Sequence, residues 1–253
     1  MPVEYEKKGH VAVITMNRPE ARNAINGEMA ETMEAAIDQM ESDPDVWVGI
    51  LTAVGKAFCA GADLKEISAG NGAALSTKKG GFAGIARRER TKPLIAAITG
   101  SALAGGTEVA LSCDMIICAD DTNFGLPEVK VGVFPMQVLS LLQSIVPRRL
   151  VNEWALTGEP FDAQAALAAG LINHVAPAAE LDAKVDWLVG RLTDKSPTAI
   201  RRGKYAMRAI ASMSFDEAIA YTESQIALLA MTEDAKEGLK AFAEKRKPSW
   251  PGR

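Results

Sequence analysis

The stretch LIAAITGSALAGGTEVAL, residues 94–111, decides the fold. Its apolar, β-branched beginning predicts a buried strand that ends near Thr99. The pair Gly105-Gly106 predicts a turn, and we expect a helix to begin there. A strand, a turn and a helix in immediate succession are typical of an α/β protein.

Glu108 is the only charged residue between Pro93 and Cys113. It falls in the first turn of the predicted helix, so folding this apolar stretch would bury its carboxylate and raise its pKa. A raised pKa suits proton transfer near neutral pH. A structural carboxylate, stabilised by backbone donors at the helix start, is an equally good interpretation of this residue alone. Gly105 would present a bare N–H beside it, which suits a developing enolate oxygen, although a simple turn also explains the glycine pair.

Two further segments offer candidate site residues. In KAFCAGADLKE, residues 56–66, Gly61 lets the chain bend sharply and Ala62 would direct its N–H outward. Two such donors would form an oxyanion hole, while an ordinary turn into a helix remains an alternative for this segment. In FGLPEVKVG, residues 124–132, Pro127 disfavours a helix and predicts a loop, from which Glu128 would project into a cleft or into solvent.

The first half of the chain follows an α/β pattern. Alternating and β-branched runs predict further strands at Val11–Met16, Val46–Thr52 and Met115–Ala119, with helical or irregular sequence between them. Helical spacing of apolar residues after the first strand predicts core packing, by Met29, Met33, Ala36, Ile37 and Met40. The glycine-rich segment 66–91 predicts a mobile surface segment near a site.

After about residue 137 helix signals dominate. They are Asp162 followed by Gly170, Ser196-Pro197, Ser214 with Glu217, and Thr232. This change from α/β to all-α sequence predicts a division into residues 1–190, which would carry the active site, and a helical region at 191–253.

Composition and motifs exclude several classes of function. The formal net charge of -4 provides no basic field for nucleic acid. The N-terminus lacks an apolar run of signal-peptide length, so we expect a cytoplasmic protein. Residues 93–113, interrupted by a proline and glycines, suit a buried unit better than a membrane span.

The three cysteines and two histidines lack the spacing of a disulfide framework or a metal site. Nucleophile-elbow, dinucleotide-binding, zinc-protease and phosphate-loop motifs are not matched.

Six segments in order resemble the enoyl-CoA hydratase/isomerase (crotonase) superfamily. They are VAVITMNRPEARNAIN, KAFCAGADLKE, ALAGGTEVALSCD, FGLPEVKVG, LTGEPFDAQAALAAGLINHV and AFAEKRKP. Each segment is weak evidence alone, but their common order and spacing over nearly the whole chain make the resemblance specific.

The resemblance implies a crotonase-like spiral of ββα units followed by C-terminal helices, assembled as a homotrimer or hexamer, with an acyl-CoA thioester as substrate. By motif position, Ala62 and Gly105 would be the backbone donors of the oxyanion hole. Glu108 and Glu128 match both carboxylates of the family's hydratases. The implied reaction is syn addition of water, with no metal and no cofactor beyond the coenzyme A that belongs to the substrate.

The resemblance also implies coenzyme A contacts. Arg22 and Ala24 would lie along the pantetheine and phosphates, with Ala60, Asp63, Leu64 and Lys65 around the adenine, although solvation alone also explains Arg22 and Lys65. The chain departs from many hydratases after Glu128, where GVFPMQVLSLLQ lacks a glycine pair. There, Phe134, Met136 and Val138 predict either an apolar acyl lining or core packing at a helix start.

The function predicted from the sequence is hydration of 2-enoyl-CoA to 3-hydroxyacyl-CoA. Alternatives within the same family are double-bond isomerisation and dehydration of a hydroxyacyl-CoA. A third alternative, from another class, is an acyl-CoA-binding protein without catalysis. Retention of both glutamates favours hydration or its reverse.

Overall fold

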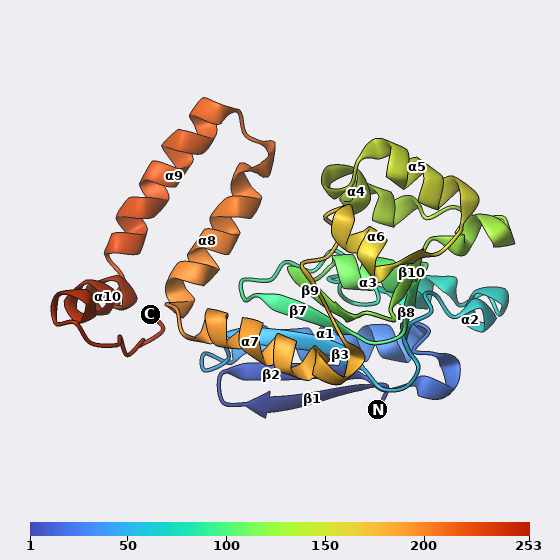
Figure 1. Cartoon of the computed structure of the whole chain (residues 1–253), viewed down its shortest axis with the longest axis horizontal. Coiled ribbons are helices and arrows are strands. Elements are labelled where there is room, and N and C mark those ends of the chain that lie inside the picture. Colours follow the sequence, from blue (N-terminus) through green and yellow to red (C-terminus); the bar gives the residue numbers. More distant parts are fainter.

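Alternating and β-branched residues form the central sheet, whose strands lie in the order β1-β2-β3-β7-β9-β12 (Figure 1). The computed structural model describes residues 1–253. The strands are β1 (Val3–Lys8), β2 (Val11–Met16), β3 (Val48–Ala53), β7 (Leu94–Ile98), β9 (Met115–Ala119) and β12 (His174–Ala176). β1 and β2 are antiparallel, and the other neighbours are parallel. The predicted strands at β2, β7 and β9 are confirmed residue for residue, and β3 begins two residues after its predicted start.

A second, four-stranded sheet lies in the order β11-β10-β8-β4. Its strands are short: β4 (Ala57–Cys59), β8 (Ser101–Leu103), β10 (Asn123–Gly125) and β11 (Phe161–Asp162). Each of β4, β8 and β10 directly follows a strand of the large sheet, and helices α2 (Leu64–Ser68) and α3 (Gly105–Leu111) follow β4 and β8. The chain therefore repeats strand, strand, helix as a spiral, which is the predicted architecture.

Two local predictions need correction. The segment between Thr99 and Gly105 is not simply a turn, because it contains β8; a strand of only three residues leaves too little alternation to detect. The predicted loop around Glu128 is instead β10 followed by η3, a 3₁₀ helix over Pro127–Val131. Proline begins this helix, since the missing N–H has no intrahelical partner at the first position.

Helix α1 (Gly27–Ser42) packs its apolar stripe into the core, where all five predicted stripe residues are buried. Asn26 begins the helix, because its side chain accepts a hydrogen bond from the Met29 N–H. Behind the large sheet, α7 (Leu181–Thr193) covers the strands with Leu181, Val185 and Val189. Gly190 lies inside α7, and the division of the chain near this residue stays a prediction.

After about residue 137 the chain is mostly helical, as expected. Its remaining helices are α4 (Met136–Ile145), α5 (Arg148–Thr157), α6 (Ala163–Ala168), α8 (Pro197–Ala209), α9 (Phe215–Ala230) and α10 (Glu233–Ala243). The predicted start signals are confirmed by side-chain caps from Asp162, Ser196 and Thr232, and by a capping box of Ser214 with Glu217.

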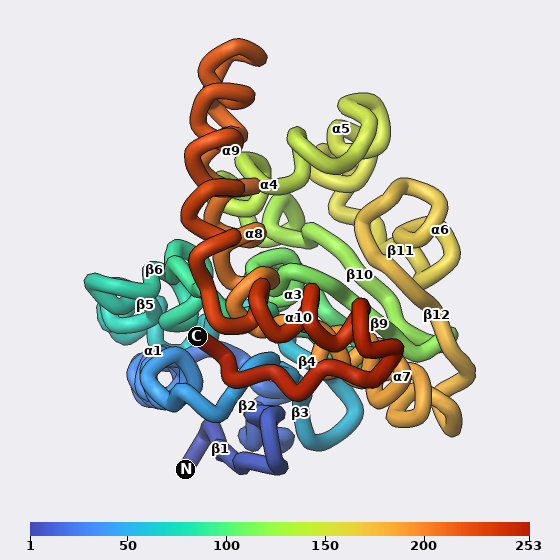
Figure 2. The backbone as a smooth tube through the Cα atoms, turned by 90° about the vertical axis from the view of Figure 1, so that its left-hand side faces the viewer, coloured from blue at the N-terminus to red at the C-terminus, as the bar shows by residue number.

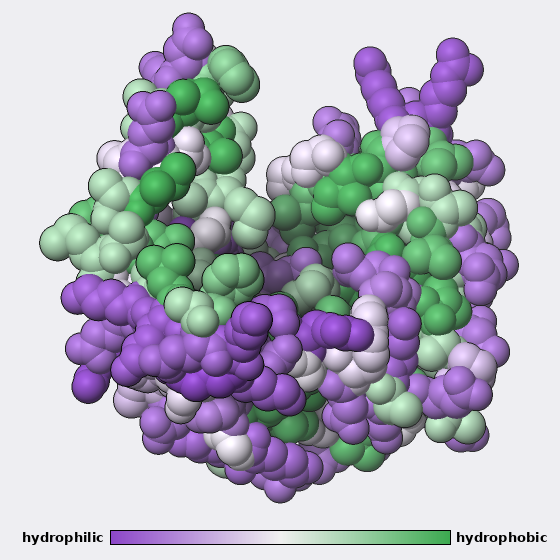
Figure 3. Space-filling model, turned by 60° about the vertical axis from the view of Figure 1, so that its left-hand side comes forward, coloured by the Kyte–Doolittle hydropathy of each residue, from purple (hydrophilic) through white to green (hydrophobic).

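Helices α8 and α9 form a C-terminal arm that stands away from the body (Figures 1 and 2). The C-terminal residues return to the base of this arm, where the buried Asp234 carboxylate accepts hydrogen bonds from Ser196, Thr198 and Gly252. Apolar side chains are exposed along the arm and on the body across from it (Figure 3). No helix is long and apolar enough to cross a membrane.

Candidate active site

A cleft of about 550 Å³ contains both predicted carboxylates and both predicted backbone donors. Residues of α2, α3, η3, the start of α4 and the small hairpin of β5 (Ser76–Thr77) with β6 (Gly81–Phe82) line it. Most of this lining is apolar, and the polar exceptions near the carboxylates are Ser76, Lys130 and Gln137. Such a cleft, with few polar groups in an apolar lining, is typical of a small-molecule site.

The Ala62 and Gly105 N–H groups lie on two turns that pack against each other. Gly61 has φ +93°, and a Cβ there would lie 2.9 Å from the Gly105 nitrogen, so only glycine permits this approach. The N–H groups of Ala62 and Gly105 donate no hydrogen bond within the chain. Two unpaired donors on adjoining turns form the arrangement that an oxyanion hole requires.

The backbone around these donors is strained and held from both sides. Ala104, just before α3, has φ 53° and ψ −129°, a conformation that costs a non-glycine residue about 1–3 kcal/mol. On the other turn, Ile25 accepts from the Asp63 N–H at 2.9 Å and donates to the Gly61 carbonyl at 2.8 Å. These bonds fix the direction of the peptide between Gly61 and Ala62.

Glu108 occupies the first turn of α3 and is only 9% exposed. Burial, together with the smaller effect of the Glu128 charge, raises the pKa of its carboxyl to about 7. The buried-carboxylate prediction for Glu108 is therefore confirmed. A group with this pKa exchanges a proton readily near neutral pH.

Glu128 reaches the same cleft from η3 and is half-buried. Burial raises its pKa as well, and its Oε2 atom is buried without a hydrogen-bond partner. An unpaired buried carboxylate oxygen is costly in a folded protein and is characteristic of functional sites. The two carboxyls share one cleft, so ionisation of one disfavours ionisation of the other.

Comparison with known proteins assigns the family. The model of the enoyl-CoA hydratase/isomerase family matches residues 6–253. The chain belongs to this family. It is 38% identical to a carnitinyl-CoA dehydratase of Proteus mirabilis, over 97% of both chains. Among solved structures it resembles an enoyl-CoA hydratase from Mycobacterium tuberculosis, with 37% identity, a TM-score of 0.94 and coverage of 100% and 99% of the two chains. A carnitinyl-CoA hydratase from Mycobacterium avium is 39% identical, with a TM-score of 0.78 and coverage of 100% and 99%.

These similarities confirm the predicted family and crotonase fold. They extend over the whole chain, so the C-terminal arm belongs to the family's fold as much as the spiral does. In this fold the cleft lies between the turns at Gly61 and Gly105 on one side and η3 on the other.

A groove of about 460 Å³ adjoins the cleft in this member of the enoyl-CoA hydratase/isomerase family. It shares Ala60, Ala62 and Leu64 with the cleft. Of the residues predicted to contact coenzyme A, the groove is lined by Ala24, Ala60, Asp63, Leu64 and Lys65. Arg22 is not among the residues that line the groove. The Arg22 carbonyl accepts a hydrogen bond from the Ala60 N–H at 3.0 Å, and this bond aligns the two segments that form the groove, residues 18–24 and 60–65.

Asp63 is occupied by bonds within the protein. Its carboxylate pairs with Arg18 at 2.7 Å and caps α2 through the Lys65 N–H, and the Arg18 contact leads the causes that lower its pKa. Arg18 also donates to the Ala24 carbonyl and lines the groove, although the sequence analysis did not select it. Arg18 and Arg22 lie four residues apart in similar polar sequence, and only the folded chain shows that Arg18 lines the groove whereas Arg22 does not.

The two interpretations of the segment after Glu128 each apply to part of it. Phe134 and Met136 line the cleft, as the acyl-lining interpretation predicts, whereas Val138 is 1% exposed and packs in the core, as the alternative predicts. Phe82, from the glycine-rich segment 66–91, was missed; a Cβ on Gly105 would lie 2.5 Å from its Cζ atom. No nearby motif marks this phenylalanine, because its position depends on how the hairpin folds back over α3.

The histidines and cysteines lie outside the cleft. His10 stacks on Trp47 with ring centroids 3.6 Å apart, and His174 meets Trp187 edge-on. Cys59 and Cys118 are buried, Cys113 is half-buried, and all three are free thiols. No group of three or more His, Cys, Asp or Glu side chains is placed to hold a metal ion.

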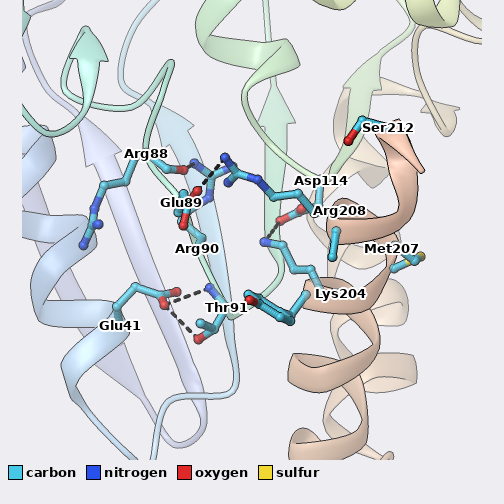
Figure 4. A pocket seen from close by; sticks show the side chains of 12 residues that line it. Glu41, Arg88, Glu89, Arg90, Thr91, Asp114, Lys204, Met207, Arg208 and Ser212 are labelled. Carbon is cyan, nitrogen blue, oxygen red and sulfur yellow. Dashed lines mark hydrogen bonds and ion pairs between the residues drawn. The ribbon is translucent and has the colours of Figure 1, made fainter. Parts of the chain in front are cut away.

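A larger cavity, about 950 Å³, lies elsewhere, between residues 88–91 and α8 (Figure 4). Its charges are largely paired across the gap: Arg208 with Glu89 at 2.8 Å, and Lys204 with Asp114 at 2.7 Å. These pairs attach the arm to the body. The Nε atoms of Arg88 and Arg90, which line this cavity, are buried without hydrogen-bond partners, but the cavity lacks the apolar lining that distinguishes the cleft.

Proposed function

We propose that the protein hydrates 2-enoyl-CoA thioesters to 3-hydroxyacyl-CoA. The observation that carries this proposal is the presence, in one cleft, of two unpaired N–H donors and two carboxyls with raised pKa. Hydration needs a polarised carbonyl and a positioned water, and this set of groups suits both.

The mechanism assigns a task to each group. The Ala62 and Gly105 N–H groups hold the thioester oxygen and stabilise the enolate as negative charge develops on it. Glu108 and Glu128 hold one water between them. As the water oxygen bonds to Cβ, the ionised carboxylate takes a proton from the water and the Cα=Cβ π electrons move toward the thioester. The protonated carboxyl gives its proton to Cα, so one water is consumed, the pair of carboxyls ends with one proton as it began, and nothing is oxidised. Mutual repulsion keeps one carboxyl protonated and the other ionised near neutral pH. This reaction needs no metal or separate cofactor.

Coenzyme A would lie in the adjoining groove. Ala24, Ala60, Leu64 and Lys65 provide its lining, while Asp63 acts indirectly by pairing with Arg18 and shaping the wall. Arg22 contributes through its backbone. The apolar side chains exposed on the arm support self-association, for which the homotrimer or hexamer and the cytoplasmic location expected from the sequence remain proposals.

A second candidate is dehydration of carnitinyl-CoA, the reaction named for the relatives at 38% identity. It is the same chemistry in reverse and differs in the acyl group, which carries a quaternary ammonium. The cleft lining includes no acid other than Glu108 and Glu128, and its one lysine, Lys130, pairs with Glu159 outside the lining at 2.8 Å. This lining favours an uncharged acyl chain.

Steady-state assays separate these reactions. Crotonyl-CoA and longer 2-enoyl-CoAs should lose their conjugated-thioester absorbance with the purified protein, and Glu108→Gln should abolish that loss. Carnitinyl-CoA should react more slowly than 3-hydroxybutyryl-CoA in the reverse direction. The absence of hydration at every chain length would refute the proposal. Acyl-CoA binding by calorimetry without turnover would then identify a non-catalytic binding protein.

A further inference from the structure

A buried hydroxyl connects the segments that carry the two carboxylates. Glu108 follows Thr107 in the first turn of α3, whereas Glu128 lies just beyond β10. Thr107 is 1% exposed, and its Oγ1 lies 2.8 Å from the Ala102 carbonyl of β8 and 3.1 Å from the Gly125 carbonyl of β10. The single hydroxyl proton is therefore shared between neighbouring strands of the small sheet.

The same contacts hold the turn that presents the Gly105 donor. The Ala104 N–H donates to the Gly125 carbonyl at 2.8 Å, and the Thr107 N–H donates to the Ala104 carbonyl at 2.9 Å. Ala104 is the residue with the strained backbone, so these bonds help to maintain its conformation. One buried network thus includes the donor turn, the start of the Glu108 helix and the strand that leads to Glu128.

We infer that Thr107 is a positioning residue that sets the distance and orientation between Glu108 and Glu128. A side chain needed only for packing would fill this site equally well as valine, which has nearly the same shape. The hydroxyl adds directed bonds to two strands, and these bonds restrict sliding of α3 along β10. The inference rests on the proposed hydration, since it concerns the shared water of that reaction.

The kinetic test compares Thr107→Val with Thr107→Ser. Valine keeps the shape and removes the hydroxyl, so we expect kcat to fall roughly 10²-fold, as small misplacements of reacting groups do. KM should stay nearly unchanged, because the coenzyme A groove is built from other segments. Serine restores the hydroxyl and should restore kcat.

A matched control is Thr122→Val. Thr122 is also buried, and its hydroxyl donates to the Ile98 carbonyl at 3.4 Å, at the end of β10 remote from Glu128. It should lower the melting temperature without changing kcat. Equal losses of kcat in both valine variants would show a general effect of lost hydrogen bonds and would overturn the inference.

A second measurement does not depend on activity. Carboxyl ¹³C NMR titration reports the coupling between the two glutamates directly, and Lys130 is the other charged group that lines their cleft. In Thr107→Val the titration of Glu108 should move down from about 7 by the smaller part of its shift, which the Glu128 charge causes, while the larger part due to burial remains. If this variant fails to fold, Thr107→Ala provides the same comparison. An unchanged titration in a folded variant would refute the positioning role, whereas inactivity of the wild-type protein would refute the proposed hydration alone.

Discussion

At the residue scale, the paired glutamates allow a test of the mechanism. If Glu108 and Glu128 hold the same water, losing either one already misplaces the nucleophile, so their effects should be strongly non-additive. Glu108→Gln and Glu128→Gln should each lower kcat by about 10²–10⁴, and the double variant should be little worse than either single variant. Coenzyme A affinity, measured by calorimetry, should be unchanged in all three. Wild-type hydration by Glu128→Gln would show that this residue is only a half-buried structural carboxylate.

The raised pKa of Glu108 also has a consequence for stability. The folded state holds this proton to about pH 7, whereas the unfolded chain releases it near 4.5. Between these values the folded state binds more protons, so the free energy of unfolding falls as the pH rises. The glutamine side chain in Glu108→Gln does not titrate, so this contribution to the pH dependence of stability is lost. Relative to wild type, its stability should rise by on the order of 3 kcal/mol between pH 4.5 and 7 and then stay level.

Urea unfolding across this pH range, at a fixed protein concentration, measures the difference. The comparison cancels the titration of Glu128 and of every other group to first order. A difference that does not change with pH would mean that Glu108 titrates normally in the folded protein.

At the scale of elements, the first residue of α3 must donate its N–H. Proline is tolerated at that helix position, and Gly105→Pro removes the N–H donor while adding a ring that meets Phe82. With Phe82 also replaced, hydration should fall about 10²–10³-fold while both carboxylates stay intact. Gly105→Ala keeps the N–H and is the matched control. Any side chain at Gly105 meets Phe82, so both substitutions should be made in a Phe82→Ala background. Equal activity of the two variants would exclude this N–H from the oxyanion hole.

At the scale of the whole molecule, the arm exposes apolar surface that a partner copy would cover. On α9, Phe215 is 78% and Ile226 is 67% exposed. Phe215→Asp with Ile226→Asp should convert the assembly to monomers in light scattering coupled to size-exclusion chromatography, because burying two unpaired carboxylates in an interface is costly. Ser224→Asp adds a charge to the same helix and should leave the assembly intact if Ser224 lies off the interface. A wild-type protein that is already monomeric would contradict the proposed oligomer.

Much of the fold was predictable because its signals are local. Strands such as Leu94–Ile98 are recognised from apolar and β-branched runs of adjacent residues, and helix starts such as Ser214 with Glu217 from residues within one turn. The burial of Glu108 was predictable for the same reason, since its apolar neighbours adjoin it in sequence. Strands of two or three residues, including β8 and β10, were not recognised because they contain too little pattern.

By itself, the sequence indicated four strands of the large sheet, several helix starts, and the candidate carboxylates and glycine turns. Only the tertiary structure decided which distant groups meet: Gly61 against Gly105, Arg18 with Asp63, and Phe82 over α3. It also showed that Arg18 lines the groove beside the cleft, whereas Arg22 contributes only a backbone hydrogen bond between the two segments that form this groove. The physical reason is that local pattern specifies an element within a few residues, whereas contacts between elements depend on how the two sheets and their turns close around a shared core.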